Sequence, residues 1–130
     1  MVRRFAAVFA FALLVAACGG PQQSELPGVY VATYANGTEK VTLDRGGTFS
    51  QEVRLEGGDS VVMNTGTWQY ISGRVDLQHC LAVGDGFGRI RGDFATALGA
   101  CSPSVGRRWP FAGELRLGGD EDPSPLWKVR

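Results

Sequence analysis

Residues 40–55 read KVTLDRGGTFSQEVRL, and this stretch decides the fold class. Residues 40–44 alternate between apolar and polar side chains, and residues 48–55 do the same after the turn signal Gly46-Gly47. In the second segment the alternation puts Phe49, Gln51, Val53 and Leu55 on one face. A period of two is the pattern of a β-strand with one buried face. Two such segments across a short glycine turn predict an antiparallel hairpin.

The flanking sequence extends this pattern in both directions. Residues 28–34 are rich in β-branched and aromatic residues and predict a strand. Asn36-Gly37 follows and favours a tight hairpin turn in which both positions have positive φ. Residues 60–71 predict one long strand or two short ones, with Gly66 as a bulge or bend, and Ser72-Gly73 turns the chain into a strand over residues 74–82.

The C-terminal part gives weaker signals. Residues 83–112 predict a long loop with one helical turn capped by Asp93. Residues 114–117 and 126–129 predict a closing hairpin. The whole pattern predicts an all-β fold, a small antiparallel up-and-down β-barrel or half-barrel of about seven to eight strands.

The N-terminus has the layout of a secretory signal. Arg3 and Arg4 precede residues 5–17, an unbroken run of 13 apolar residues. A membrane-spanning helix needs about 20 apolar residues, so this run is too short to span. We therefore expect residues 1–17 to be a cleaved signal peptide, residues 18–27 a flexible polar tether and residues 28–130 the β domain.

Val15-Ala16-Ala17-Cys18 resembles the lipobox of bacterial lipoproteins, whose cysteine becomes the new N-terminus. The resemblance implies that the Cys18 thiol carries diacylglycerol and that the new amine is acylated. Two or more acyl chains hold a protein stably at a membrane. In the sorting pattern that the motif resembles, glycine at position 19 implies an outer-membrane protein facing the periplasm, with the inner membrane and the cell surface as alternatives. The competing interpretation is a secreted protein with a free Cys18.

Three short glycine-aromatic segments, residues 28–30, 47–49 and 66–68, each open an expected strand. Together they resemble the small lipocalin-like domains of bacterial lipoproteins. The resemblance covers roughly residues 28 to 81. It implies a β-barrel or half-barrel and carries over no site residue.

The other two cysteines, Cys80 and Cys101, are expected to form a disulfide, since the signal peptide directs the chain to an oxidising compartment. Strand parity predicts that Cys80 points away from the core, towards a covering loop. The alternative is a metal or redox pair, which the missing Cys-x-x-Cys spacing disfavours. We expect no metal and no cofactor.

The same parity predicts that His79, the only histidine, faces inward with Val75, Leu77 and Leu81. Gln51 also lies on a core face. Inward polar groups need hydrogen-bond partners. One interpretation is a ligand cavity lined by Gln51, His79 and Trp68; the other is that each polar group is satisfied locally.

Catalytic signals are weak. A serine triad needs a histidine oriented by an acid, and no nucleophile elbow accompanies His79. The glycine-rich residues 84–92 match no phosphate-binding spacing. Without residues 1–17 the chain has 11 basic and 13 acidic residues, a balance that does not suit nucleic acid. We therefore expect a non-catalytic, membrane-anchored binding or interaction module. The alternatives are an inhibitor of a cell-wall-degrading enzyme such as lysozyme and a carrier of a small apolar ligand.

Overall fold

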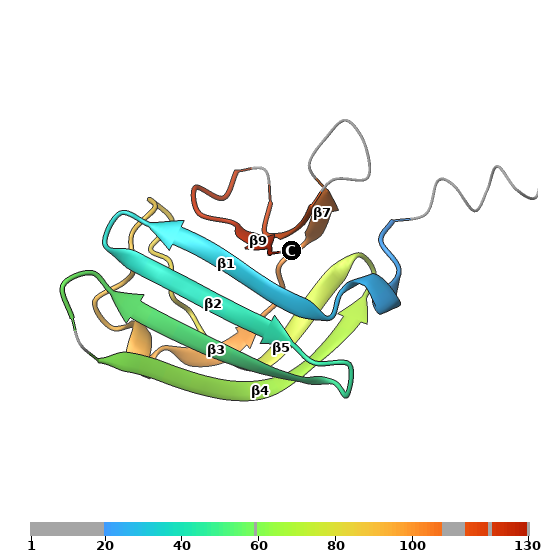
Figure 1. Cartoon of the computed structure of the whole chain (residues 1–130), viewed down its shortest axis with the longest axis horizontal. Helices are drawn as coiled ribbons and strands as arrows, with labels where there is room; N and C mark the ends of the chain where they lie inside the picture. Colours follow the sequence, from blue (N-terminus) through green and yellow to red (C-terminus); the bar gives the residue numbers. More distant parts are fainter. Residues whose placement is uncertain (1–19, 59, 108–113, 120, 130) are drawn as a thin grey trace, which may run out of the picture.

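The computed structural model describes residues 20–58, 60–107, 114–119 and 121–129. In this part of the chain nine antiparallel strands form a single sheet that curls into a half-barrel (Figure 1). The strand order is β6-β5-β4-β3-β2-β1-β9-β8-β7. The strands are β1 (Gly28–Tyr34), β2 (Gly37–Leu43), β3 (Thr48–Leu55), β4 (Val61–Ile71), β5 (Arg74–Leu81), β6 (Leu98–Cys101), β7 (Val105–Arg107), β8 (Leu115–Leu117) and β9 (Leu126–Lys128).

The remaining regular elements are two single 3₁₀ turns, η1 (Gln23–Glu25) and η2 (Phe94–Thr96). Within the described ranges, no helical segment combines the length and the apolar character needed to cross a membrane.

Strands β1 to β5 form the predicted meander, and each pairs with the next through a short turn. The predicted C-terminal hairpin is also present, as β8 and β9, and β9 pairs with β1. The expected count of seven to eight strands is wrong, because the segment predicted as a loop contains β6 and β7. Their sequences, LGAC and VGR, are too short and too glycine-rich to show a period.

The core lies on the concave side of the curled sheet. The alternation in β3 is confirmed for Phe49, Gln51 and Val53, which are buried. Leu55 is 42% exposed because it ends the strand. Gly66 pairs with Phe49, whose ring would lie 2.6 Å from a Cβ at position 66. The aromatic ring therefore covers the glycine, and the glycine lets the strands approach closely where the sheet bends.

The first hairpin differs in detail from the prediction. Tyr34 pairs with Gly37, so the two turn residues are Ala35 and Asn36 rather than Asn36 and Gly37, and neither has a positive φ. Gly37 is needed for a different reason: a Cβ there would collide with the Arg54 carbonyl oxygen of the neighbouring strand. Asn36 serves to hold a distant loop, as described below.

The N-terminal segment is folded onto the domain, so the expected tether over residues 18–27 is shorter than predicted. Leu26 is fully buried, and its carbonyl oxygen accepts a hydrogen bond from the Tyr30 hydroxyl at 2.6 Å. The Glu25 carboxylate forms an ion pair with Arg107 at 2.7 Å. The backbone carbonyl oxygen of Glu25 accepts a hydrogen bond from the Lys128 ammonium group at 2.5 Å. Cys18 and the expected signal peptide lie outside the described residues.

We predict that Gly66→Ala destabilises the domain by more than about 2 kcal/mol, because the new Cβ would collide with the Gln78 carbonyl oxygen and the Phe49 ring. The control is Gly99→Ala, since a Cβ at position 99 meets nothing within 4 Å. The control is expected to change stability by no more than about 0.5 kcal/mol. Urea unfolding followed by tryptophan fluorescence measures both, and equal losses would contradict the close-approach argument.

Candidate functional site: an acidic cavity inside the half-barrel

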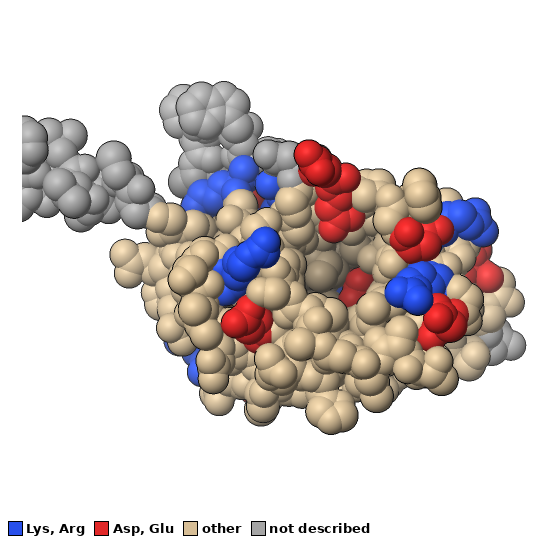
Figure 2. Space-filling model, turned by 180° about the vertical axis from the view of Figure 1, so that it is seen from behind, with Lys and Arg blue, Asp and Glu red and all other residues tan. Residues whose placement is uncertain are grey.

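A cavity of about 600 Å³ opens on the concave side of the sheet. Figure 2 shows it as a hollow with acidic groups at its edge and inside it. Its lining comes from six strands, β1, β2, β5, β6, β8 and β9, and from the segments that follow β5, β6 and β8: Tyr34, Glu39, Val41, Leu77, Cys80, Leu81, Ala82, Val83, Gly84, Gly86, Cys101, Ser102, Pro103, Leu117, Gly119, Glu121, Asp122, Pro123, Ser124 and Leu126. The walls combine aliphatic side chains with a few polar groups at fixed positions.

A buried carboxyl group lies in the wall of this cavity. Glu39 is only 6% exposed, because it shares the inner face of β2 with Val41 and Leu43. Its Oε1 accepts a hydrogen bond from the Tyr34 hydroxyl at 3.0 Å, and its Oε2 accepts from the Gln51 side-chain amide at 2.7 Å. These two donors, on the strands either side of β2, fix the orientation of the carboxyl group.

Gln51 connects Glu39 to the end of β5. Its amide nitrogen donates to the Leu81 carbonyl oxygen, and its Oε1 accepts from the Leu81 N–H, both at 2.9 Å. Asn64, which pairs with Gln51 across β3 and β4, donates to Gln51 Oε1 at 3.1 Å and to the His79 carbonyl oxygen at 2.6 Å. The pairing of β4 with β5 ends at Thr67 and Gln78. Beyond that point β4 no longer pairs with β5, and the side chains of Gln51 and Asn64 form hydrogen bonds to the β5 backbone instead.

The parity prediction for His79 is wrong. The β5–β6 register shifts between Gln78 and Cys80, so the strand has a β-bulge. His79 has φ 65° and is exposed to solvent. A bulge adds one residue to a strand and reverses the side-chain alternation beyond it. His79 therefore faces outward and does not line the cavity.

The Cys80–Cys101 disulfide is confirmed, with the two Cα atoms 5.9 Å apart. Its predicted side is wrong, because the bulge turns Cys80 into the core, where it is 4% exposed and lines the cavity. Closing a loop of this length stabilises a fold by about 3 kcal/mol in the chain-entropy model. Here the disulfide also fixes β6 against the wall of the cavity.

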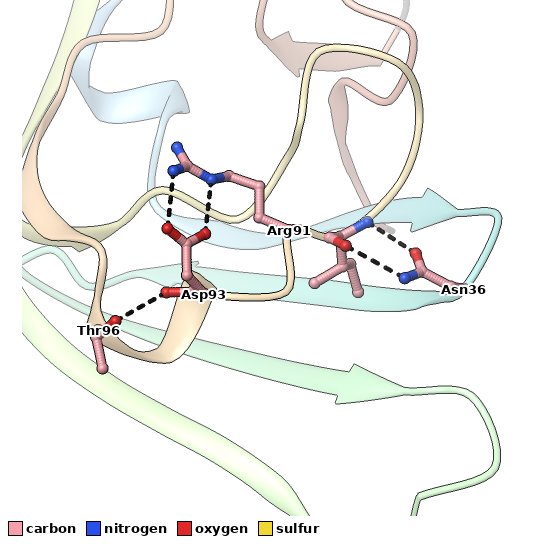
Figure 3. Close-up of polar contacts among 5 residues, drawn as sticks. Asn36, Arg91, Asp93 and Thr96 are labelled. Carbon is pink, nitrogen blue, oxygen red and sulfur yellow. Dashed lines mark hydrogen bonds and ion pairs between the residues drawn. The ribbon is translucent and has the colours of Figure 1, made fainter.

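The segment after β5 forms a short loop held over the end of the barrel. The Asp85 carboxylate accepts from the N–H groups of Phe87 and Arg89 at 2.7 and 3.2 Å. Asn36, in the β1–β2 turn, accepts from the Ile90 N–H at 2.7 Å and donates to its carbonyl oxygen at 3.2 Å (Figure 3). This pair of bonds fixes the loop, whose Gly84 and Gly86 line the cavity.

The predicted helical turn after this loop is present as η2, but Asp93 does not cap it with its side chain. The Asp93 carboxylate instead makes a two-point ion pair with Arg91 at 3.0 and 3.1 Å (Figure 3). Phe94, the first residue of η2, is buried beside Ile90 in a second small core.

Two expected site residues remain, Trp68 and Gln51: Trp68 belongs to the core, and Gln51 belongs to the hydrogen bonds around Glu39. Trp68 is buried, but its indole N–H donates to the Asp44 carbonyl oxygen at 2.7 Å, and it does not line the cavity. Gln51 is inward as predicted and contacts the cavity through Glu39. Sequence reasoning missed Tyr34 and Glu39. A signal for Glu39 was present: it has the parity of Val41 and Leu43, so an acid had to fall on a core face.

Burial and neighbouring acids control ionisation at this site. Burial raises the pKa of Glu39 above its usual value of 4.5, and the negative charge of Asp122 adds to the rise, while the hydrogen bonds from Gln51 and Tyr34 oppose it. Burial also raises the pKa of the Tyr34 hydroxyl, helped by Glu39, Asp122 and Asp85. Burial is the largest cause of both shifts, and nearby acids add to them.

No protein-family model, curated protein or solved structure matches this chain. Among the described residues, no three His, Cys, Asp or Glu side chains are grouped so that they could hold a metal ion. The chemistry that this arrangement offers is recognition: aliphatic walls for an apolar body and an oriented, buried carboxyl group for a hydrogen-bond donor or a cation.

We predict that Glu39→Gln makes the domain relatively more stable than the wild type as pH rises. The folded-state pKa of Glu39 is raised, so keeping Glu39 ionised in the fold costs free energy above its unfolded-state pKa. Glutamine keeps the hydrogen bonds, because its oxygen can accept from Gln51 and its amide can donate to the Tyr34 oxygen. Thermal unfolding followed by circular dichroism from about pH 4 to about pH 8 measures the unfolding midpoint of each protein. The difference in midpoint between Glu39→Gln and the wild type is expected to grow as pH rises.

The control for this series is Glu56→Gln, a change of the same chemistry at an exposed turn residue. Its midpoint is expected to follow that of the wild type across the range. A constant gap between Glu39→Gln and the wild type at every pH would contradict the burial argument.

Proposed function

We propose that this protein is a non-catalytic binding protein of the bacterial cell envelope, anchored to a membrane by lipid on Cys18, that takes a small ligand into the cavity of its β domain. The observation that supports a small ligand is the cavity itself, with a volume of about 600 Å³. Small-molecule sites in proteins have volumes of about 300 to 1,000 Å³, mostly apolar walls and a few placed polar groups. A filled barrel would have favoured a protein partner instead.

The position of the folded N-terminus fits an anchored protein. Only residues 19–21 separate Cys18 from Gln22, the residue that caps η1. An extended chain covers at most about 3.6 Å per residue, so the linker spans little more than about 10 Å. A lipid on Cys18 would hold the domain close to the membrane surface. The contacts of Glu25 with Arg107 and Lys128 would then fix which end of the barrel faces the lipid.

Binding in the cavity is tested with Ala82→Trp. Ala82 is half-buried and lines the cavity, so an indole there is expected to fill part of it. The neutral fluorescent dye N-phenyl-naphthylamine is the probe, because its emission rises in apolar surroundings. We predict that the substitution weakens dye binding by at least about tenfold.

The matched control for the filled cavity is Ala100→Trp, on the exposed side of β6 and outside the cavity lining. It adds the same indole and is expected to bind the dye as the wild type does. Equal binding by both variants would place the dye elsewhere and contradict a ligand site in the cavity.

The anchor is tested independently of the cavity. In a bacterial host, the full chain is expected to fractionate with membranes, and mass spectrometry of its mature N-terminus is expected to show an acylated Cys18. Cys18→Ser is expected to remove the protein from the membrane fraction, because the thiol that carries the lipid is gone. An unmodified Cys18 in the mature wild-type protein would contradict the anchor and leave the cavity proposal standing.

A further inference from the structure

Among the residues that the structure describes, the charged groups lining the cavity have one sign. Glu39, Glu121 and Asp122 are among the lining residues, and none of the described lining residues is lysine, arginine or histidine. Asp85 lies close enough to raise the pKa of Tyr34 in the cavity wall. A cavity with low-dielectric walls and charges of one sign concentrates ligands of the opposite sign.

Glu39 lacks the partner that a buried carboxylate normally has. Buried charges in proteins are paired with opposite charges or bind metals. In the described part of the chain, none of the ion pairs includes Glu39, and no positive charge contributes to its pKa. Its two oxygens accept one hydrogen bond each, from Tyr34 and Gln51. A carboxylate offers about four acceptor positions, so the group retains capacity for a further donor.

The Tyr34 and Gln51 contacts keep Glu39 oriented without neutralising it. Both partners are uncharged, and Gln51 is held in turn by both backbone groups of Leu81. This is the arrangement expected of an oriented binding group, since preorganised polar groups lower the cost of ordering on binding.

We propose that the cavity binds an amphipathic cation, a ligand with a primary ammonium group and an aliphatic body, with the ammonium group at Glu39. The proposal rests on the binding function proposed above and specifies its ligand class. Burial favours the neutral acid in the empty cavity, and a bound ammonium group supplies the positive charge that keeps Glu39 ionised and donates to its carboxylate. The aliphatic body lies along Val41, Leu77 and Leu117, which form part of the apolar wall.

The alternatives differ in charge. An anionic amphiphile, such as a fatty acid, would be repelled by Glu39, Glu121 and Asp122 and would leave its own charge desolvated. A neutral alcohol would gain the apolar contacts and one hydrogen bond, but it would leave Glu39 without a counter-charge. The three head groups should therefore rank as ammonium, then alcohol, then carboxylate.

The test uses three ligands that share one chain: octylamine, octanol and octanoate. Isothermal titration calorimetry at neutral pH measures each against the wild type. Octylamine is expected to bind at least about tenfold more tightly than octanol, with octanoate weakest. In Glu39→Gln the preference for octylamine over octanol is expected to disappear, because the ammonium group loses its counter-charge.

The circular dichroism spectrum of Glu39→Gln is expected to match that of the wild type, which shows that the variant keeps its fold. Glu56→Gln, which removes an acid outside the cavity lining, is expected to retain the full preference. A wild type that binds octanol as tightly as octylamine would overturn the inference and leave the proposed binding function intact. A preference that survives in Glu39→Gln would overturn the assignment to Glu39. Failure of all three ligands and of the dye would overturn the binding function as well.

Discussion

The cavity depends on how the backbone of β5 is satisfied where that strand leaves β4. From His79 to Leu81, β5 has no hydrogen-bonding partner in β4, and unpaired buried backbone groups are costly. Gln51 and Asn64 supply the missing bonds from their side chains. An amide can do this because it both donates and accepts, as a peptide unit does. The interior of the half-barrel therefore contains a polar network beside its apolar core.

The β-bulge and this network form one unit. The bulge places His79 outside and turns Cys80 inward, which brings the disulfide to the cavity. The Leu81 backbone is what Gln51 bonds, and Gln51 in turn holds Glu39. A buried acid without a cationic partner is costly to the fold. Groups of that kind, with shifted pKa values and an opening to solvent, concentrate at functional sites.

Whether the position of a site residue could be predicted from the sequence depends on how far apart in the chain its interacting residues lie. Gln51 could be placed on the core face because β3 is regular and its period is unbroken. His79 could not be placed, since one inserted residue reverses the parity of β5, and a bulge residue with positive φ is most often glycine. The disulfide pairing was predictable from the compartment that the N-terminal sequence predicts, whereas the side on which Cys80 lies depended on the same bulge. Glu39 was readable from parity alone, but its partners Tyr34 and Gln51 come from flanking strands.

The sequence by itself determined the all-β class, the hairpins of β1 to β5, the closing β8–β9 pair and the pairing of Cys80 with Cys101. The strands and hairpins rest on local alternation and turn residues, which act over a few residues. The disulfide follows from there being two cysteines outside the N-terminal segment. Tertiary structure alone decided the existence of β6 and β7, the docking of Leu26 into the core, and the cavity with its oriented carboxyl group. Each of these requires contacts between residues far apart in the chain, such as Asn36 with Ile90 and Gln51 with Leu81, and no local pattern encodes them.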